Sequence, residues 1–180
     1  MIEGKTIFLR PLTTEDIPVW AAWFNDPEVT EHMNKGMFPV AEHSQLEFFQ
    51  GLSQSRTDVQ LGIVLKEDNL LIGTIGIHKI DWIHRHGAIS IVLGAKQSWG
   101  RGLATEAVGS IIRHAFTKLN LHRLTAGMWG SNIRSRACFE KNGFTLEGTL
   151  RESFFYRDSY VDEWILGLLR SEWAAAQSKA

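Results

Sequence analysis

The chain has 180 residues, of which 19 are Lys or Arg and 20 are Asp or Glu, so its formal net charge at pH 7 is −1. A chain of this length is expected to form one domain, spanning 1–180, whose core needs no disulfide or metal to be stable. The balanced charge argues against general binding to nucleic acid or to a membrane surface, because both usually require a basic excess.

The cysteine content and the N-terminal composition predict a cytoplasmic protein. Cys138 is the single cysteine, so an internal disulfide is excluded and a reducing compartment fits. The first residues lack a basic segment followed by an apolar one, and no apolar run reaches the roughly 18 residues of a membrane span. Because basic and acidic residues nearly balance, any site for an anionic ligand must be a local feature.

The first third of the chain predicts one strand and two helices. Residues 6–10 read as a strand, which Pro11 ends because proline cannot donate to a strand ladder. An apolar stripe at helical spacing follows a threonine cap and predicts a helix that ends at Asn25. A loop over 26–39, which we expect to contact substrate, leads to a second helix over 40–52.

The middle of the chain switches to the alternation that is typical of strands. Apolar residues at every second position over 59–65 share one face before a polar turn at 66–69. The segment 70–80 returns as the second strand of a hairpin, and 87–93 forms the next strand.

The last half of the chain continues with alternating helices and strands. The expected elements are a helix over 103–119, a strand over 122–129, a helix over 133–142 that Gly143 ends as a left-handed cap, and a hairpin of 144–155 and 160–169. The sum is an α/β or α+β domain with a mixed sheet of about seven strands and about four helices.

The most informative segment is a glycine-bearing loop over 97–106, with the sequence Gln-Ser-Trp-Gly-Arg-Gly-Leu-Ala-Thr-Glu, between an expected strand and an expected helix. Two glycines with one residue between them allow successive N–H groups to converge on an anion. The helix that follows adds its unpaired first-turn N–H groups and the positive end of its dipole. The loop therefore predicts a ligand that carries phosphates, although a strand-to-helix turn can also require two glycines for its geometry alone.

Two common phosphate-binding loops do not fit this sequence. A P-loop needs Gly-Lys followed by Ser or Thr, which the segment lacks. A dinucleotide fingerprint needs Gly or Ala at Thr105 and an acidic residue about 20 positions past the loop, and neither is present. Nucleotide binding of either kind is therefore disfavoured.

The spacing Gln-x-x-Gly-x-Gly/Ala, carried here by Gln97, Gly100 and Gly102, resembles the acyl-CoA signature of the GNAT acetyltransferase superfamily. Further segments, in order along nearly the whole chain, resemble its RimJ/RimL-like branch of ribosomal-protein N-acetyltransferases. They are Leu9-Arg10-Pro11-Leu12, Asn25-Asp26-Pro27-Glu28-Val29, Asn132-Ile133-Arg134-Ser135, Phe139-Glu140-Lys141-Asn142-Gly143-Phe144 and Glu147-Gly148-Thr149-Leu150-Arg151.

The resemblance implies a GNAT fold, whose mixed and mostly antiparallel sheet contains a parallel strand pair that splays apart, here Ile89–Leu93 and Arg123–Met128. Acetyl-CoA would enter between the two strands, with its pantetheine arm paired to the free strand edge. The implied cofactor-binding residues are Ile91, Val92, Leu93, Gln97, Gly100, Arg101, Gly102, Leu103, Ala104, Thr105 and Asn132. Asn132 is equally suited to cap the helix that follows it. No metal is expected, since His84-Arg85-His86 lacks a third ligand at supporting spacing.

The resemblance leaves open which residue protonates the leaving thiolate. Many GNAT enzymes use a tyrosine four residues before the Gly-Phe pair, and Phe139 stands there in this chain. Phenylalanine has no proton to give, so Ser135, one turn earlier, is the candidate acid. Capping or lining of its helix is an equally suitable role for Ser135.

The general base is also open. Ser90 stands where some relatives carry a glutamate, so the candidates are His78, His32, Asp81 and Glu152, acting directly or through water. Cys138 is expected to fill the core, because the family transfers acyl groups directly.

These observations predict an N-acetyltransferase that moves the acetyl group of acetyl-CoA directly to a primary amine. The acceptor is open between a protein N-terminus, a small amine such as a polyamine or amino acid, and an amino sugar. A non-catalytic acyl-CoA sensor or adaptor is the alternative, because the tyrosine acid is missing. No nucleic-acid or membrane partner is expected, and the residues do not decide whether the chain forms a homodimer. Aromatic residues at Phe38, Trp82, Phe154, Phe155 and Tyr156 are expected to flank the acceptor.

Overall fold

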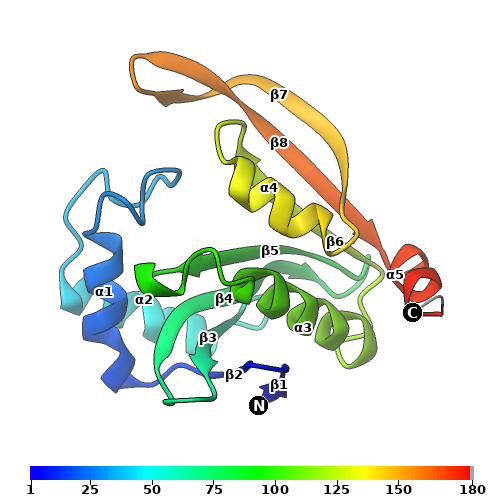
Figure 1. Cartoon of the computed structure of the whole chain (residues 1–180), viewed down its shortest axis with the longest axis horizontal. Helices are drawn as coiled ribbons and strands as arrows, with labels where there is room; N and C mark the ends of the chain where they lie inside the picture. The colour runs from blue at the N-terminus through cyan, green and yellow to red at the C-terminus, as the bar shows by residue number, and fades with distance from the viewer. Residues whose placement is uncertain (179–180) are drawn as a thin grey trace.

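The computed structural model describes residues 1–178, which form one eight-stranded sheet with helices on both faces (Figure 1). The strands are β1 (Ile2–Glu3), β2 (Ile7–Pro11), β3 (Val59–Leu65), β4 (Leu71–Asp81), β5 (His86–Leu93), β6 (Arg123–Trp129), β7 (Thr145–Tyr156) and β8 (Ser159–Leu169). The helices are α1 (Ile17–Phe24), α2 (Glu42–Gln54), α3 (Leu103–Thr117), α4 (Ile133–Glu140) and α5 (Arg170–Gln177), with short 3-10 turns at Thr14–Asp16 and Lys96–Ser98.

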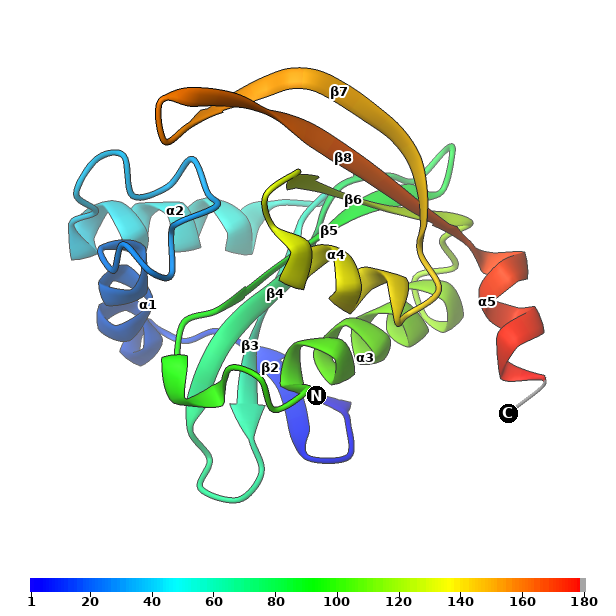
Figure 2. The same ribbon diagram turned by 45° about the horizontal axis from the view of Figure 1, so that its top comes forward.

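The strands follow the order β1-β2-β3-β4-β5-β6-β8-β7, and every neighbouring pair except one is antiparallel. The exception is the parallel pair β5 and β6, whose register runs only from His86↔Arg123 to Ala88↔Thr125. Beyond Ala88, β5 stays paired with β4, and β6 stays paired with β8 as far as Trp129. The two strands therefore open into a V, and Figure 2 shows the β7 and β8 ribbon arching over the other half of the sheet.

The main core lies between the sheet and α3. Val108, Ile111 and Phe116 recur on one face of this helix and belong to the same buried cluster as Ile75 of β4 and Leu124 of β6. Burial of each such side chain contributes about 1.5–3 kcal/mol relative to exposure. The core therefore fixes α3, and with it the loop that precedes it, against the centre of the sheet.

The opposite face of β3 and β4 is covered by α1 and α2. Trp20 and Phe24 of α1 form a second cluster with Val64 and Leu71, whose side chains point away from the first core because strand residues alternate between faces. This second cluster fixes α1 and the loop after it on the open side of the V.

The predicted fold class and the splayed pair are confirmed, and two elements were not predicted. β1 has two residues, which is too short to show any periodicity. α5 follows β8 without a glycine or proline between them, and its start is marked by the carboxylate of Glu172, which accepts a 2.8 Å hydrogen bond from the Leu169 N–H. Pro11, which was predicted to end the strand over 6–10, is the last residue of β2. Gly143 has the expected positive φ, of 89°. None of the helices within residues 1–178 has the length and apolar content needed to cross a bilayer.

Candidate active site

The glycine loop joins β5 to α3 and has the conformation that its two glycines predict. Gly100 and Gly102 have φ values of +75° and +78°, in the left-handed region that favours glycine. A Cβ atom at either position would meet no atom of the protein within 4 Å. The glycines are therefore needed for the backbone turn, and the space beside them is open to a ligand.

The first turn of α3 supplies backbone donors at this loop. Its first helical hydrogen bond runs from the Glu106 N–H to the Gly102 carbonyl, at 3.1 Å. Within residues 1–178, the N–H groups of Leu103, Ala104 and Thr105 precede that bond and have no backbone acceptor. They suit an anion, and the helix dipole adds to the attraction.

The side chains of the predicted loop residues contribute unequally. Gln97 and Arg101 are exposed, whereas the Leu103 side chain is buried in the core, so that only its backbone is available to a ligand. The hydroxyl of Thr105 is directed at the Cys138 sulfur, 3.8 Å away. The loop thus presents mainly amides, with Arg101 as its nearest cation.

The V between β5 and β6 opens into a cavity of about 350 Å³, which we call the central cavity. Four of the predicted residues line it together: Ile91, Val92, Asn132 and Ser135. The other predicted residues, Leu93, Gln97 and the segment 100–105, lie outside its lining, at the end of β5 and the start of α3.

Helix α4 forms one wall of the central cavity. The Asn132 side chain accepts a 3.0 Å hydrogen bond from the Ser135 N–H, so Asn132 is the N-cap of this helix while it also lines the cavity. Phe139 lines the cavity too, and its ring packs edge-on against Phe144 with centroids 5.1 Å apart. Because the N-cap bond fixes the first turn, Ser135 is held at the cavity wall.

Five aromatic side chains besides that of Phe139 line the central cavity. They are Trp20, Phe24, Phe48, Trp129 and Phe154. Of the five aromatic residues expected from the sequence, Phe154 is the one among the described residues that lines the cavity. Trp82 instead donates its indole N–H to the Arg56 carbonyl, and Phe38 and Phe155 are exposed. Tyr156 donates its hydroxyl to Glu31, which ties the tip of the β7–β8 hairpin to the 26–39 loop.

Lys35, in the 26–39 loop, brings a cation to two of these aromatic rings. Its Nζ atom lies 4.1 Å from the centroid of Phe48 and 4.5 Å from that of Phe24, in cation–π contact with both. Burial lowers the pKa of Lys35, because removal from water disfavours the charged form. Lys35 was not predicted as a site residue, because a lone lysine in a loop belongs to no sequence pattern that would indicate such a role.

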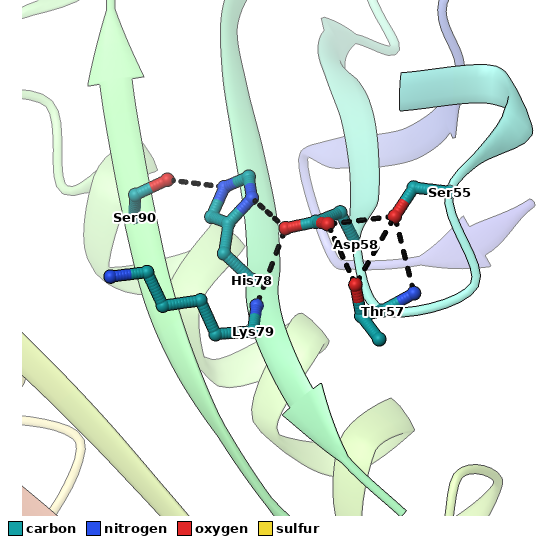
Figure 3. Close-up of polar contacts among 6 residues, drawn as sticks. All are labelled: Ser55, Thr57, Asp58, His78, Lys79 and Ser90. Carbon is teal, nitrogen blue, oxygen red and sulfur yellow. Dashed lines mark hydrogen bonds and ion pairs between the residues drawn. The ribbon is translucent and has the colours of Figure 1, made fainter. Parts of the chain in front are cut away.

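A chain of polar side chains, Ser90–His78–Asp58, crosses β3, β4 and β5 at the same cavity (Figure 3). The Nε2 atom of His78 lies 2.8 Å from the Ser90 Oγ, and its Nδ1 lies 3.1 Å from the Asp58 Oδ1. Ser90 and His78 both line the central cavity, while Asp58 lies outside its lining, immediately before β3. Gly76 makes room for the imidazole, since a Cβ there would lie 2.6 Å from the His78 Nε2.

Besides His78, three donors hold the Asp58 carboxylate: the Ser55 hydroxyl at 2.7 Å, the Thr57 hydroxyl at 3.1 Å and the Lys79 N–H at 3.3 Å. Burial alone would raise the pKa of Asp58, but these hydrogen bonds outweigh it and keep the pKa below its ordinary value. The carboxylate is therefore ionised near neutral pH and favours the tautomer of His78 with its proton on Nδ1.

The structure separates the four base candidates. His78 and His32 line the central cavity, and Asp81 and Glu152 do not. Asp81 instead accepts the N–H groups of Ile83 and His84 in the β4–β5 turn, and these bonds lower its pKa. Ser90 was not expected to capture the proton directly, and the sequence gives no sign of its contact with His78.

Cys138 is buried in the main core, as expected, and burial raises the pKa of its thiol. A thiol with a raised pKa is a poor nucleophile at neutral pH. Within residues 1–178, no group of three or more His, Cys, Asp or Glu side chains is arranged to hold a metal ion.

Comparison with known families agrees with this geometry. The family model described as an acetyltransferase (GNAT) domain matches residues 6–145. The chain belongs to the GNAT acetyltransferase family. The predicted superfamily membership is thereby confirmed, and this GNAT protein is an acetyltransferase enzyme.

Three relatives illustrate its neighbourhood in the family. N-acetyltransferase p20 of Bacillus licheniformis, itself uncharacterized, is 33% identical over 174 residues, which cover 94% of this chain and 96% of the relative. The "Putative ribosomal N-acetyltransferase YdaF" of Bacillus subtilis is 33% identical over 106 residues, covering 59% of this chain and 57% of YdaF. The crystal structure of spermidine N-acetyltransferase from Vibrio cholerae, in complex with CoA and spermine, superposes with a TM-score of 0.86 at 22% identity, covering 94% of this chain and 98% of that one.

Proposed function

We propose that this GNAT enzyme transfers the acetyl group of acetyl-CoA directly to the primary amine of a small molecule that has an apolar body. The observation that carries the proposal is the opening of the β5–β6 pair after Ala88 into a cavity with several aromatic side chains in its lining.

The chain's residues fit acetyl-CoA. The loop offers open space at Gly100 and Gly102 and the free amides of the first α3 turn, which suit a pyrophosphate. The edge of β5 beyond Ala88 is unpaired on its β6 side, and the amide groups of a pantetheine arm can bond to such an edge as an added strand would. Acetyl-CoA supplies the thioester carbonyl that the amine attacks. Ser90 and Ser135 line the cavity beside this edge and would be available to the thioester carbonyl of a bound acetyl-CoA.

The lining of the central cavity supports a small amine as acceptor. An amine that enters among Phe24, Phe48 and Trp129 loses hydration, which favours the neutral and nucleophilic form. The cited Vibrio cholerae structure contains spermine, so a small amine is a known occupant in a protein with this fold. A cavity of about 350 Å³ also suits a small molecule better than a folded protein surface.

The charges in the cavity favour a monoamine over a polyamine. Glu163 is the one carboxylate among the described residues that line the cavity, and Lys35 adds a positive charge. A polyamine carries several ammonium groups at neutral pH, and each one needs a carboxylate partner or keeps its water. A monoamine with an apolar or aromatic body needs no additional partner and covers the aromatic wall.

An amine panel tests the proposal. Purified protein is incubated with acetyl-CoA and, in turn, 2-phenylethylamine, spermidine, glucosamine and a short peptide with a free N-terminus, and the acetylated amine is quantified by mass spectrometry. We expect 2-phenylethylamine to have the highest kcat/KM, at least about tenfold above spermidine. Reaction without amine is the control for hydrolysis.

Two results would overturn different parts of the proposal. A preference for spermidine, glucosamine or the peptide contradicts the assignment of the acceptor. If calorimetry detects CoA binding but no amine is acetylated, the chain behaves as an acyl-CoA sensor, and the proposed activity is wrong.

A further inference from the structure

We propose that His78 is the general base of the acetyl transfer, that it receives the proton of the acceptor amine through the Ser90 hydroxyl, and that Asp58 positions it. The inference deepens the proposed function and rests on it. It assigns the missing base to side chains that the family resemblance did not supply.

The geometry is that of a proton relay. Because Asp58 is ionised and lies 3.1 Å from the His78 Nδ1, that nitrogen carries the ring proton, and Nε2 has its lone pair free. The Ser90 hydroxyl then donates its proton to Nε2 across 2.8 Å. Its oxygen keeps lone pairs that can accept an N–H from an amine in the cavity.

The location of the relay matches the reaction. Ser90 lies on the segment of β5 that has left β6, so its hydroxyl lines the same cavity as Ile91 and Val92, along which the pantetheine arm is proposed to bind. Figure 3 shows the Lys79 ammonium directed away from Asp58, and Lys79 contributes its backbone N–H to the network instead. The Lys79 ammonium therefore does not compete with His78 for the charge of Asp58.

The proton balance is complete without any further reactant. As the amine nitrogen forms its bond to the thioester carbon, it gives a proton to the Ser90 oxygen while the Ser90 proton passes to the His78 Nε2. The C–S bond then breaks, and the proton returns from the imidazolium through Ser90 to the departing sulfur. The products are the N-acetylated amine and CoA with a free thiol.

His32 is less well placed to act as the base, although it also lines the cavity. Its ring is stacked against that of Trp129, with the ring centroids 6.3 Å apart. Its Nδ1 lies 3.8 Å from the nearest Glu31 oxygen, beyond hydrogen-bond distance. Glu31 therefore does not fix the tautomer of His32 as Asp58 does for His78.

Kinetic variants test the assignment. We expect His78→Gln to lower kcat for 2-phenylethylamine by about 100-fold or more, with the KM for acetyl-CoA unchanged. Added imidazole should restore part of the activity of His78→Ala, which a purely structural role would not allow. His86→Gln, which replaces an exposed histidine at the paired end of β5, is the matched control and should keep full activity.

Asp58 requires a test of positioning. Asp58→Asn should lower kcat by about 100-fold or more, because a neutral amide no longer selects the Nδ1–H tautomer, while the KM for acetyl-CoA stays the same. Ser90→Ala should lower kcat less, by about tenfold, because a water molecule can occupy the place of the hydroxyl. An acetyl group found on Ser90 by mass spectrometry would overturn the inference, since it would make Ser90 a nucleophile.

A measurement independent of turnover separates this inference from the proposed function. Nitrogen-15 NMR of the free protein should report neutral His78 as the Nδ1–H tautomer, and Asp58→Asn should produce a mixture of tautomers. A dominant Nε2–H tautomer overturns the relay whether or not any amine is acetylated. Conversely, an unreactive wild-type protein with the Nδ1–H tautomer contradicts the proposed function and leaves the relay geometry standing. A His78→Gln variant that acetylates at the wild-type rate overturns the relay alone.

Discussion

The indole N–H of Trp99 donates a 2.8 Å hydrogen bond to the carbonyl of Leu93. This bond joins the last residue of β5 to the residue before Gly100, so it sets the position of the glycine loop relative to the strand that opens the V. It also engages the carbonyl of Leu93, one of the residues proposed to lie along the pantetheine arm.

The first prediction concerns this bond. Trp99→Phe keeps an aromatic ring but removes the donor, and the loss of one hydrogen bond is worth about 1 kcal/mol. We expect the Kd for CoA, measured by calorimetry, to rise about fivefold. Trp82→Phe is the matched control, because its indole N–H also donates to a backbone carbonyl at 2.8 Å, that of Arg56, away from the loop. Equal effects from both variants would contradict a special role for Trp99.

The second prediction concerns Gly102. Gly102→Val forces a β-branched residue to adopt a φ of +78° and places a side chain in the open space beside the loop amides. We expect CoA binding to fall below detection by calorimetry while circular dichroism still reports a folded protein. Gly51→Ala is the control, since a Cβ there also meets no atom within 4 Å but the residue lies on α2, remote from the loop. Undiminished CoA binding by Gly102→Val would show that the loop does not hold the pyrophosphate.

Local sequence patterns were sufficient to predict most of the fold. The period-two run over 59–65 and the apolar stripe of α3 gave strands and a helix within a few residues of their observed bounds. Periodicity could not detect β1, which pairs with β2 through two residues. It also missed α5, because the apolar end of β8 continues into an alanine-rich segment without any breaking residue.

Part of the site also follows from local sequence patterns, and the rest depends on contacts between residues far apart in the sequence. The positive φ values of Gly100 and Gly102 follow from spacing along the chain, and the resemblance to the family identified them. The Ser90–His78–Asp58 relay depends on which residues face each other across three strands. A register irregularity between Ile63 and Val64 shifts the β3–β4 pairing, so the segment lengths alone could not align Asp58 with His78.

The third prediction concerns Lys35. Lys35→Met keeps an unbranched side chain against Phe24 and Phe48 but removes the cation from the cavity. Since like charges repel strongly where water is excluded, we expect the KM for spermidine to fall about tenfold and that for 2-phenylethylamine to change by less than about twofold. Lys118→Met, at the C-terminal end of α3, is the control. An unchanged ratio of the two KM values would mean that Lys35 does not discriminate against polyamines.

The last prediction concerns the acid that protonates the leaving sulfur, because Phe139 lines the cavity where many relatives have a tyrosine. Phe139→Tyr introduces a phenol of pKa about 10, which can donate a proton as negative charge develops on sulfur. If departure of the thiolate limits the rate, kcat should rise in this variant. The ring is only 2% exposed and packs against Phe144, so the melting temperature must be measured alongside, to separate a catalytic effect from strain.

Ser135→Ala is the companion test of the same step. Ser135 lines the cavity, and its backbone N–H, which bonds to Asn132, is retained in alanine, so the helix cap should survive the substitution. If the Ser135 hydroxyl protonates the sulfur in place of Ser90, kcat should fall by about 100-fold, the usual contribution of a general acid, while the Kd for CoA stays constant. If kcat and its pH profile are both unchanged, Ser135 is structural. The proton then reaches the sulfur by another route, and the return path from His78 through Ser90 supplies one.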